Sequence, residues 1–116
     1  MKKVLGSQGE ITFFLVEGDM PEDVKPHKEI DRHGRPIISH SESGSHHVLD
    51  RAVSVMEKQN VPGGMRIFYA LLEEPAELIQ DASDAHGTHI LPAGLIEFRI
   101  AREIDHFTQQ IRQVAD

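Results

Sequence analysis

Residues 86–103, HGTHILPAGLIEFRIARE, contain the segment that decides the fold. In its second half, Ile96, Phe98 and Ile100 fall at every second position, and Glu97 stands between the first two. A period of two is the pattern of a β-strand that buries one face and exposes the other. The Pro-Ala-Gly turn before these residues punctuates the start of the strand. The stretch therefore predicts a half-buried strand with Glu97 on its wet face.

Further strands are predicted on the N-terminal side of this one. Residues 10–17 (EITFFLVE) are rich in β-branched and aromatic residues and apolar on both faces, which is typical of a central strand. Residues 65–72 (MRIFYALL) form an almost continuous apolar run between two turns, as in a buried strand. Residues 52–56 fit a helix or a strand by composition, and their alternating valines favour a strand. A short strand is also predicted at 76–80.

Other segments carry turn and breaker residues. Residues 26–39 are predicted to form a hairpin, with Gly34 supplying the positive φ angle of its tight turn. Pro36 indicates an edge strand, because proline cannot donate to a ladder. Residues 1–9 contain two glycines and are expected to form a flexible lead-in. Near the C terminus apolar residues recur at helical spacing, so that 108–115 could form a short helical turn or an irregular tail.

Many short strands at fairly even spacing imply an all-β fold, either a barrel or a sandwich. The chain of 116 residues can bury one modest core, so we expect a single β domain spanning 1–116. The apolar residues that follow the period of two are expected to be mostly buried. They are Ile11, Phe13, Leu15, Ile67, Tyr69, Leu71, Ile96, Phe98 and Ile100.

The composition restricts the classes of partner. Twelve basic against nineteen acidic residues give a net charge of −7, which argues against nucleic acid as the main partner. The chain has no cysteine, which excludes disulfides and thiolate metal sites. Since no apolar run is long enough to cross a bilayer, no membrane partner is expected. We therefore expect a soluble protein that is either cytoplasmic or assembled in a virion.

The eight histidines are many for a chain of this length. Neutral imidazoles bind zinc and other divalent transition metals, and three such ligands leave an open position for water. The candidate ligands lie in two polar loops: His46, His86 and His89, with His40 or Glu42 as a further ligand. The alternative is that these loop histidines are solvated or hydrogen-bonded to backbone carbonyls, because their spacing is not diagnostic of a metal site.

The order of motifs along the chain resembles a group of small β-rich proteins encoded by bacteria, phages and other mobile elements. That group shares a Gly-His-x-His loop, a second histidine loop before Leu-Pro-x-Gly, and a terminal Arg-Val-Ala-Asp. Here Leu-Pro-Ala-Gly stands at 91–94 and Ile-Arg-Gln-Val-Ala-Asp at 111–116. By position, Glu42 and His46 match the first loop, and His86 matches the second.

This chain departs from the group at one position, since His46 is followed directly by His47 instead of by a spaced histidine. Neighbouring residues on a strand point to opposite faces, so the two imidazoles cannot serve one strand-borne site without a bulge. We expect His47 to turn the other way. His89 could then supply the missing imidazole, or the site could be lost. His27, His33 and His106 are expected to lie on the surface.

Two functions follow from these patterns. The first is a non-enzymatic β-domain of phage or mobile-element origin, a virion component or an accessory factor, acting through a protein partner or self-association. The apolar excess of 65–72 could supply the interface. The second is a small histidine-ligated metalloenzyme or metal-binding protein of cupin-like plan.

A specific geometric prediction accompanies both functions. His46 and His86, each leading a strand from a polar loop, are expected to come within a few ångströms of one another. They would then either share a metal ion or fasten the two loops without one. We favour the metal-free arrangement, because the broken His-x-His pattern leaves the site one ligand short.

Overall fold

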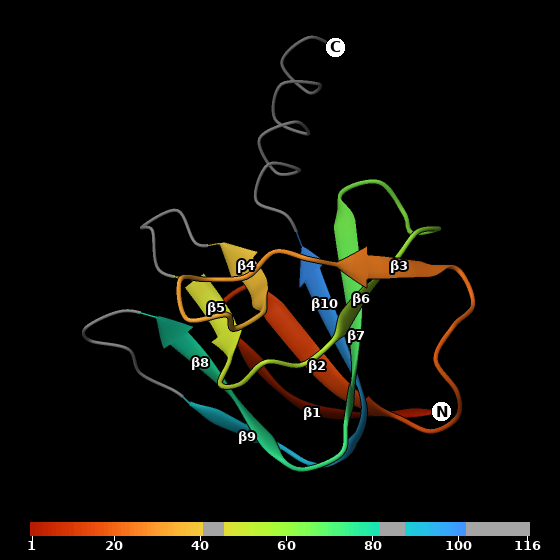
Figure 1. Cartoon of the computed structure of the whole chain (residues 1–116). Coiled ribbons are helices and arrows are strands. Elements are labelled where there is room, and N and C mark those ends of the chain that lie inside the picture. Colours follow the sequence, from red (N-terminus) through yellow and green to blue (C-terminus); the bar gives the residue numbers. More distant parts are fainter. Residues whose placement is uncertain (41–45, 82–87, 102–116) are drawn as a thin grey trace, which may run out of the picture.

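The computed structural model describes residues 1–40, 46–81 and 88–101. Within these ranges the regular elements are all β-strands, as predicted (Figure 1). The strands are β1 (Lys2–Gln8), β2 (Ile11–Val16), β3 (Val24–His27), β4 (Ile37–His40), β5 (His46–Leu49), β6 (Val55–Lys58), β7 (Met65–Leu72), β8 (Ala76–Asp81), β9 (His89–Leu91) and β10 (Gly94–Ala101). The predicted C-terminal helical turn lies outside the described residues.

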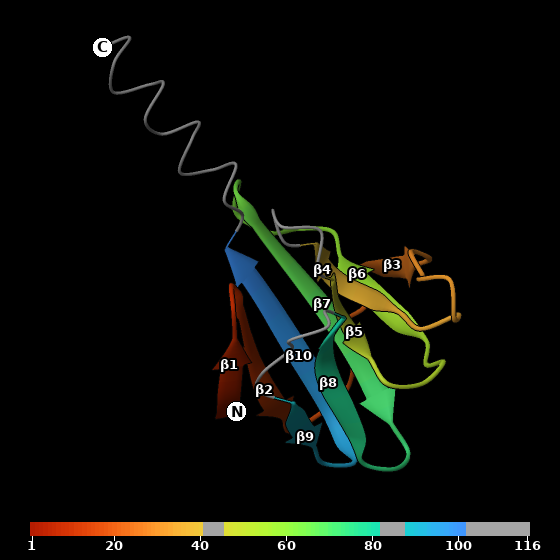
Figure 2. The ribbon, with the colours of Figure 1, turned by 90° about the vertical axis from the view of Figure 1, so that its left-hand side faces the viewer.

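The strands form two antiparallel sheets that pack face to face (Figure 2). The larger sheet has the order β1-β2-β10-β7-β6-β3, and the smaller has β4-β5-β8-β9. At one margin β1 lies against β9. At the other margin His27 of β3 makes a 2.8 Å hydrogen bond from Nε2 to the carbonyl of Ile37 in β4. The fold is thus an all-β sandwich whose two margins are closed by contacts between the sheets.

The core between the sheets is organised around β10. Antiparallel pairing places Phe98 of β10 directly opposite Phe13 of β2 and Phe68 of β7. All three rings are at most 1% exposed. Leu49 and Leu78 of the smaller sheet, both fully buried, pack in the same cluster. Most of the residues predicted to be buried are buried, and Leu15 is partly so.

The prediction that Glu97 lies on a wet face is wrong, because Glu97 is only 3% exposed. The outer face of the larger sheet holds a second apolar cluster, around Tyr69 and Leu95, which covers it. Three donors reach the Glu97 carboxylate: the Tyr69 hydroxyl at 2.8 Å, Lys2 Nζ at 3.0 Å and Arg99 Nε at 2.6 Å. Burial alone would raise the pKa of Glu97, but these hydrogen bonds outweigh it and lower that pKa.

Leu71 also departs from the prediction, since it is 61% exposed. It lies on the same outer face as Tyr69, because the two residues are two apart on β7. Met20, Val24 and other partly buried side chains pack around Tyr69, but they leave Leu71 open. An apolar side chain therefore faces solvent at the end of the chain's most apolar strand.

Two segments pair differently from what the sequence predicts. Residues 1–9, expected to be flexible, form β1, which pairs with β2 and bulges between Val4 and Gly6. The expected hairpin of 26–39 keeps its turn, where Gly34 has φ of +80°, but its ladder is reduced to one bridge between Ile30 and Pro36. The residues just before it, Val24–His27, form β3, which pairs with β6. The turn could be predicted from its local sequence, whereas the strands that pair with the flanking segments could not.

The three paired phenylalanines, Phe13, Phe98 and Phe68, should contribute much of the free energy of unfolding. Phe98→Ala is expected to lower the free energy of unfolding by about 3–5 kcal/mol, because the ring is fully buried and its removal leaves a cavity. Leu71→Ala, at an exposed site of the adjacent strand, should cost less than about 1 kcal/mol. Urea unfolding followed by far-UV circular dichroism measures both. Equal costs for the two variants would contradict the assignment of the core.

Candidate functional site

Histidines and carboxylates gather at one end of the sandwich, where β4 ends and β5 begins. In the pairing of these strands, His40 lies opposite His46, and Ser39 lies opposite His47. Because successive side chains on a strand alternate between faces, the two adjacent histidines of β5 enter different surroundings, as expected. His47 is 2% exposed and faces the core, whereas His46 is only partly buried.

His47 is held by the turn between β1 and β2. Its Nδ1 lies 2.7 Å from the side-chain oxygen of Gln8, and the Gln8 amide donates to the carbonyl of Leu78 at 3.1 Å. Since Gln8 Oε1 can only accept, His47 carries its proton on Nδ1. Gly9, with φ of +58°, passes over the ring, and a Cβ there would come within 3.1 Å of Nε2. Glycine suits this position because it adopts a positive φ without strain and has no Cβ to collide with the His47 ring.

The other nitrogen of His47 faces a carboxylate. Glu10 Oε2 lies 3.7 Å from His47 Nε2, and the Ser39 hydroxyl donates to the other Glu10 oxygen. Burial lowers the pKa of His47, and the opposing effect of the Glu10 charge is smaller. His47 is therefore a neutral imidazole that fastens the β1–β2 turn to the smaller sheet. The bond from Ser39 to Glu10 differs from the serine–histidine bond of a catalytic triad.

His40 and His46 form a second arrangement on the outer side. Their Nδ1 atoms are 3.0 Å apart, and their rings meet at 87° with centroids 4.5 Å apart. On the far side of His40, Nε2 lies 2.5 Å from Glu29 Oε1. The side chains of His40 and Glu29 are 47% and 45% exposed. A hydrogen-bonded row thus runs from Glu29 through His40 to His46, within reach of solvent.

The strand register separates His89 from this row. His89 pairs with Leu78, which pairs with Leu49, three residues along β5 from His46. The separation is about 10 Å along the strands and about 10 Å across them. His89 also lies on the inner face, where its ring contacts Phe13 at a centroid distance of 5.2 Å. It therefore cannot join His46 in one ligand set.

Two predicted ligands, Glu42 and His86, lie outside the described residues. The predicted approach of His46 to His86 stays a prediction for the same reason. Within 1–40, 46–81 and 88–101, no group of three or more His, Asp or Glu side chains is arranged to hold a metal ion. Of the predicted set, the structure brings together His40 and His46. The sequence analysis did not identify Glu29, which lies 11 residues before His40.

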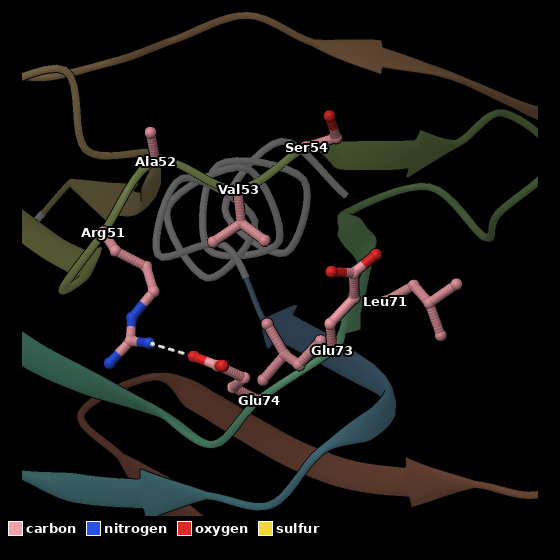
Figure 3. Close-up of a pocket in the computed structure, with 8 residues that line it drawn as sticks. Arg51, Ala52, Val53, Ser54, Leu71, Glu73 and Glu74 are labelled. Carbon is pink, nitrogen blue, oxygen red and sulfur yellow. Dashed lines mark ion pairs between the residues drawn. The ribbon is translucent and has the colours of Figure 1, made fainter.

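A pocket of about 340 Å³ lies beyond the other end of β5 (Figure 3). It is formed by the β5–β6 connection and the β7–β8 turn. Across it Arg51 and Glu74 point toward one another, with Arg51 Nη1 3.6 Å from Glu74 Oε2. The lining residues are Arg51, Ala52, Val53, Ser54, Leu71, Leu72, Glu73 and Glu74. Sequence reasoning treated Glu73 and Glu74 as a solvated turn and did not identify the pocket.

The buried state of His47 has a consequence for stability. Its pKa in the folded chain is below the usual value of about 6.5, so the unfolded chain takes up the proton first as pH falls. The stabilisation by neutral His47 is complete above about pH 6.5 and declines as pH falls toward the folded pKa. His47→Asn, which keeps a donor for Gln8, should remove this decline. Urea unfolding at pH 7.5, 6.5 and 5.5 measures it.

The exposed His33 provides the matched control, since His33→Asn should retain the pH dependence of the wild type. If His47→Asn and the wild type lost stability in parallel between pH 7.5 and 5.5, His47 would not be the buried titrating group.

Comparison with known proteins adds no functional assignment. No protein-family model, curated protein or solved structure matches this chain. Within the described residues, no helix is long and apolar enough to span a bilayer. Function is therefore inferred from the geometry described above.

Proposed function

We propose that this chain is a non-enzymatic β-sandwich domain that acts through protein contacts, and that the pocket beside Leu71 is the centre of its contact surface. The observation that carries the proposal is the exposure of Leu71. Single exposed apolar side chains are ordinary at a protein surface; Leu71, which is 61% exposed, is distinguished by the adjoining pocket, which a partner side chain could enter. The resemblance to phage and mobile-element proteins suggests a virion component or an accessory factor as the setting.

The pocket suits a single side chain or a short segment of a partner. Its volume, about 340 Å³, is at the lower end of the range for binding pockets, roughly 300–1,000 Å³. Leu72, which is 4% exposed, forms an apolar part of the lining, and Val53 adds a second. An apolar side chain that entered here would lose its contact with water, and burial of that area would favour binding.

Charge indicates what should surround that apolar side chain. Glu73 and Glu74 stand at the pocket, and the whole chain carries a net charge of −7. The ion pair between Arg51 and Glu74 is exposed on both sides, at 47% and 81%, so it contributes little and can be exchanged for another. Two copies of this acidic surface would repel one another. A basic partner segment therefore fits better than self-association through the pocket.

The edges of the two sheets also favour contact through side chains over pairing with a strand of the partner. Edge strands invite pairing with other chains unless charges, prolines, bulges or short length prevent it. Of the four edge strands, β1 carries Lys2, Lys3 and a bulge, and β3 contains Pro26; β4 has only four residues and an irregular register, and β9 has only three residues. Strand addition at these edges is disfavoured, so that a partner would bind through side chains at a face or an end of the sandwich.

Selection from a random peptide library on the immobilised chain tests this proposal. The selected peptides should place Lys or Arg next to a bulky apolar residue, and their affinity should fall with added salt. Leu71→Asp should weaken binding of a selected peptide about tenfold or more, because it places a charge in the apolar contact. Fluorescence polarisation with the labelled peptide measures the dissociation constant.

Ile90 offers a matched control, because it is an apolar residue on the other sheet and is 73% exposed. Ile90→Asp should change affinity less than about twofold. A double variant, Glu73→Lys with Glu74→Lys, should reverse the preference for basic peptides. Failure to select peptides, or an equal loss in Leu71→Asp and Ile90→Asp, would refute the pocket as the contact centre.

A further inference from the structure

The row Glu29–His40–His46 has an unusual arrangement of nitrogen atoms. The carboxylate of Glu29 accepts a hydrogen bond, so His40 Nε2, 2.5 Å away, carries a proton. In neutral His40 the lone pair is then on Nδ1, which points at His46 Nδ1 from 3.0 Å. Two facing lone pairs at this distance would repel. Either His46 donates a proton from Nδ1, or both lone pairs turn toward a cation that lies beside the line joining the two nitrogens.

We propose that His40 and His46 bind one divalent transition metal ion through their Nδ1 atoms, with Glu29 orienting His40. With metal–nitrogen bonds of about 2.0–2.1 Å, two imidazole nitrogens on one ion lie roughly 2.9–3.4 Å apart, depending on geometry. The observed 3.0 Å is near the right-angle end of this range, and a tetrahedral ion would need the two nitrogens to move apart by roughly 0.3–0.4 Å. The ion replaces the single proton that the two nitrogens share in its absence.

The surroundings of His40 match those of a metal-binding histidine. A ligating histidine almost always donates its other ring N–H to a carboxylate, carbonyl or water, which fixes the tautomer and the ring orientation. Glu29 occupies that position behind His40. His40 and His46 also lie opposite one another on paired strands, so that the backbone holds their separation.

The site differs in place from the predicted one. His40 and His46 lie on the outer face of the smaller sheet, and His40 is 47% exposed, so an ion can enter from solvent. His47 and His89, on the inner face, take no part. Two ligands of the proposed ion come from the described residues. Imidazole ligands favour zinc, nickel or copper over magnesium or calcium.

Calorimetric titration of the full chain, purified without a histidine tag, with zinc chloride tests the proposal. The wild type should bind one zinc ion per chain with a saturable isotherm. His40→Ala and His46→Ala should each abolish binding in the same concentration range. Glu29→Gln, which keeps both ligands but removes the orienting charge, should weaken binding about 10–100-fold.

Two other histidines serve as controls. His33→Ala, at an exposed turn, and His89→Ala, on the inner face, should bind zinc as the wild type does. Circular dichroism confirms that each variant is folded. No saturable binding by the wild type, or unchanged binding after loss of His40 or His46, would overturn the proposal. The pair lies at the opposite end of β5 from the Leu71 pocket, so that peptide binding and zinc binding can fail independently.

Discussion

The in-register pairing of β10 with β2 and β7 is the constraint on which the structure depends. It stacks Phe13, Phe98 and Phe68 side by side in the core. A shift of β10 by one residue would turn Phe98 away from the other two rings and bring the Glu97 carboxylate into the core. On the other face the same register places Glu97 opposite Tyr69, which donates to it. Both faces of β10 therefore enforce a single alignment, and the rest of the sandwich assembles against it.

The sequence predicted elements whose signal is local. Alternation at Ile96, Phe98 and Ile100 identified β10, and turn residues marked Gly34, because these patterns depend on neighbours in the chain. Burial of Glu97 could not be predicted, since it requires a tyrosine 28 residues away and a lysine 95 residues away. Likewise, exposure of Leu71 depends on where segments distant in sequence stop covering the outer face. The alternation of apolar residues identifies a strand, but tertiary packing determines whether each of its side chains is buried or exposed.

The same limit applies to the candidate site. The sequence indicated that His46 and His47 must diverge, because adjacent strand residues face opposite ways, and it included His40 and His46 among the candidate ligands. It did not identify Glu29, which lies only 11 residues before His40. It could not find Gln8 or the pocket at Leu71, since each depends on segments distant in sequence. It also grouped His89 with His46, which the register of β5, β8 and β9 separates. The strand register thus determines the role of each imidazole. His47, on the inner face, is neutral and holds the β1–β2 turn, whereas His40 and His46, on the outer face, form a pair that solvent can reach.

Imidazole tautomers, read from long-range ¹H–¹⁵N correlation spectra of the labelled chain, test this central claim most directly. His47 should carry its proton on Nδ1 at pH 7, because Gln8 accepts a hydrogen bond there. The Nδ1–H form of His47 should persist as pH is lowered below about 6.5, since burial lowers its pKa. His40 should carry its proton on Nε2, next to Glu29. A His47 that is protonated on Nε2 and titrates near pH 6.5 would contradict the account.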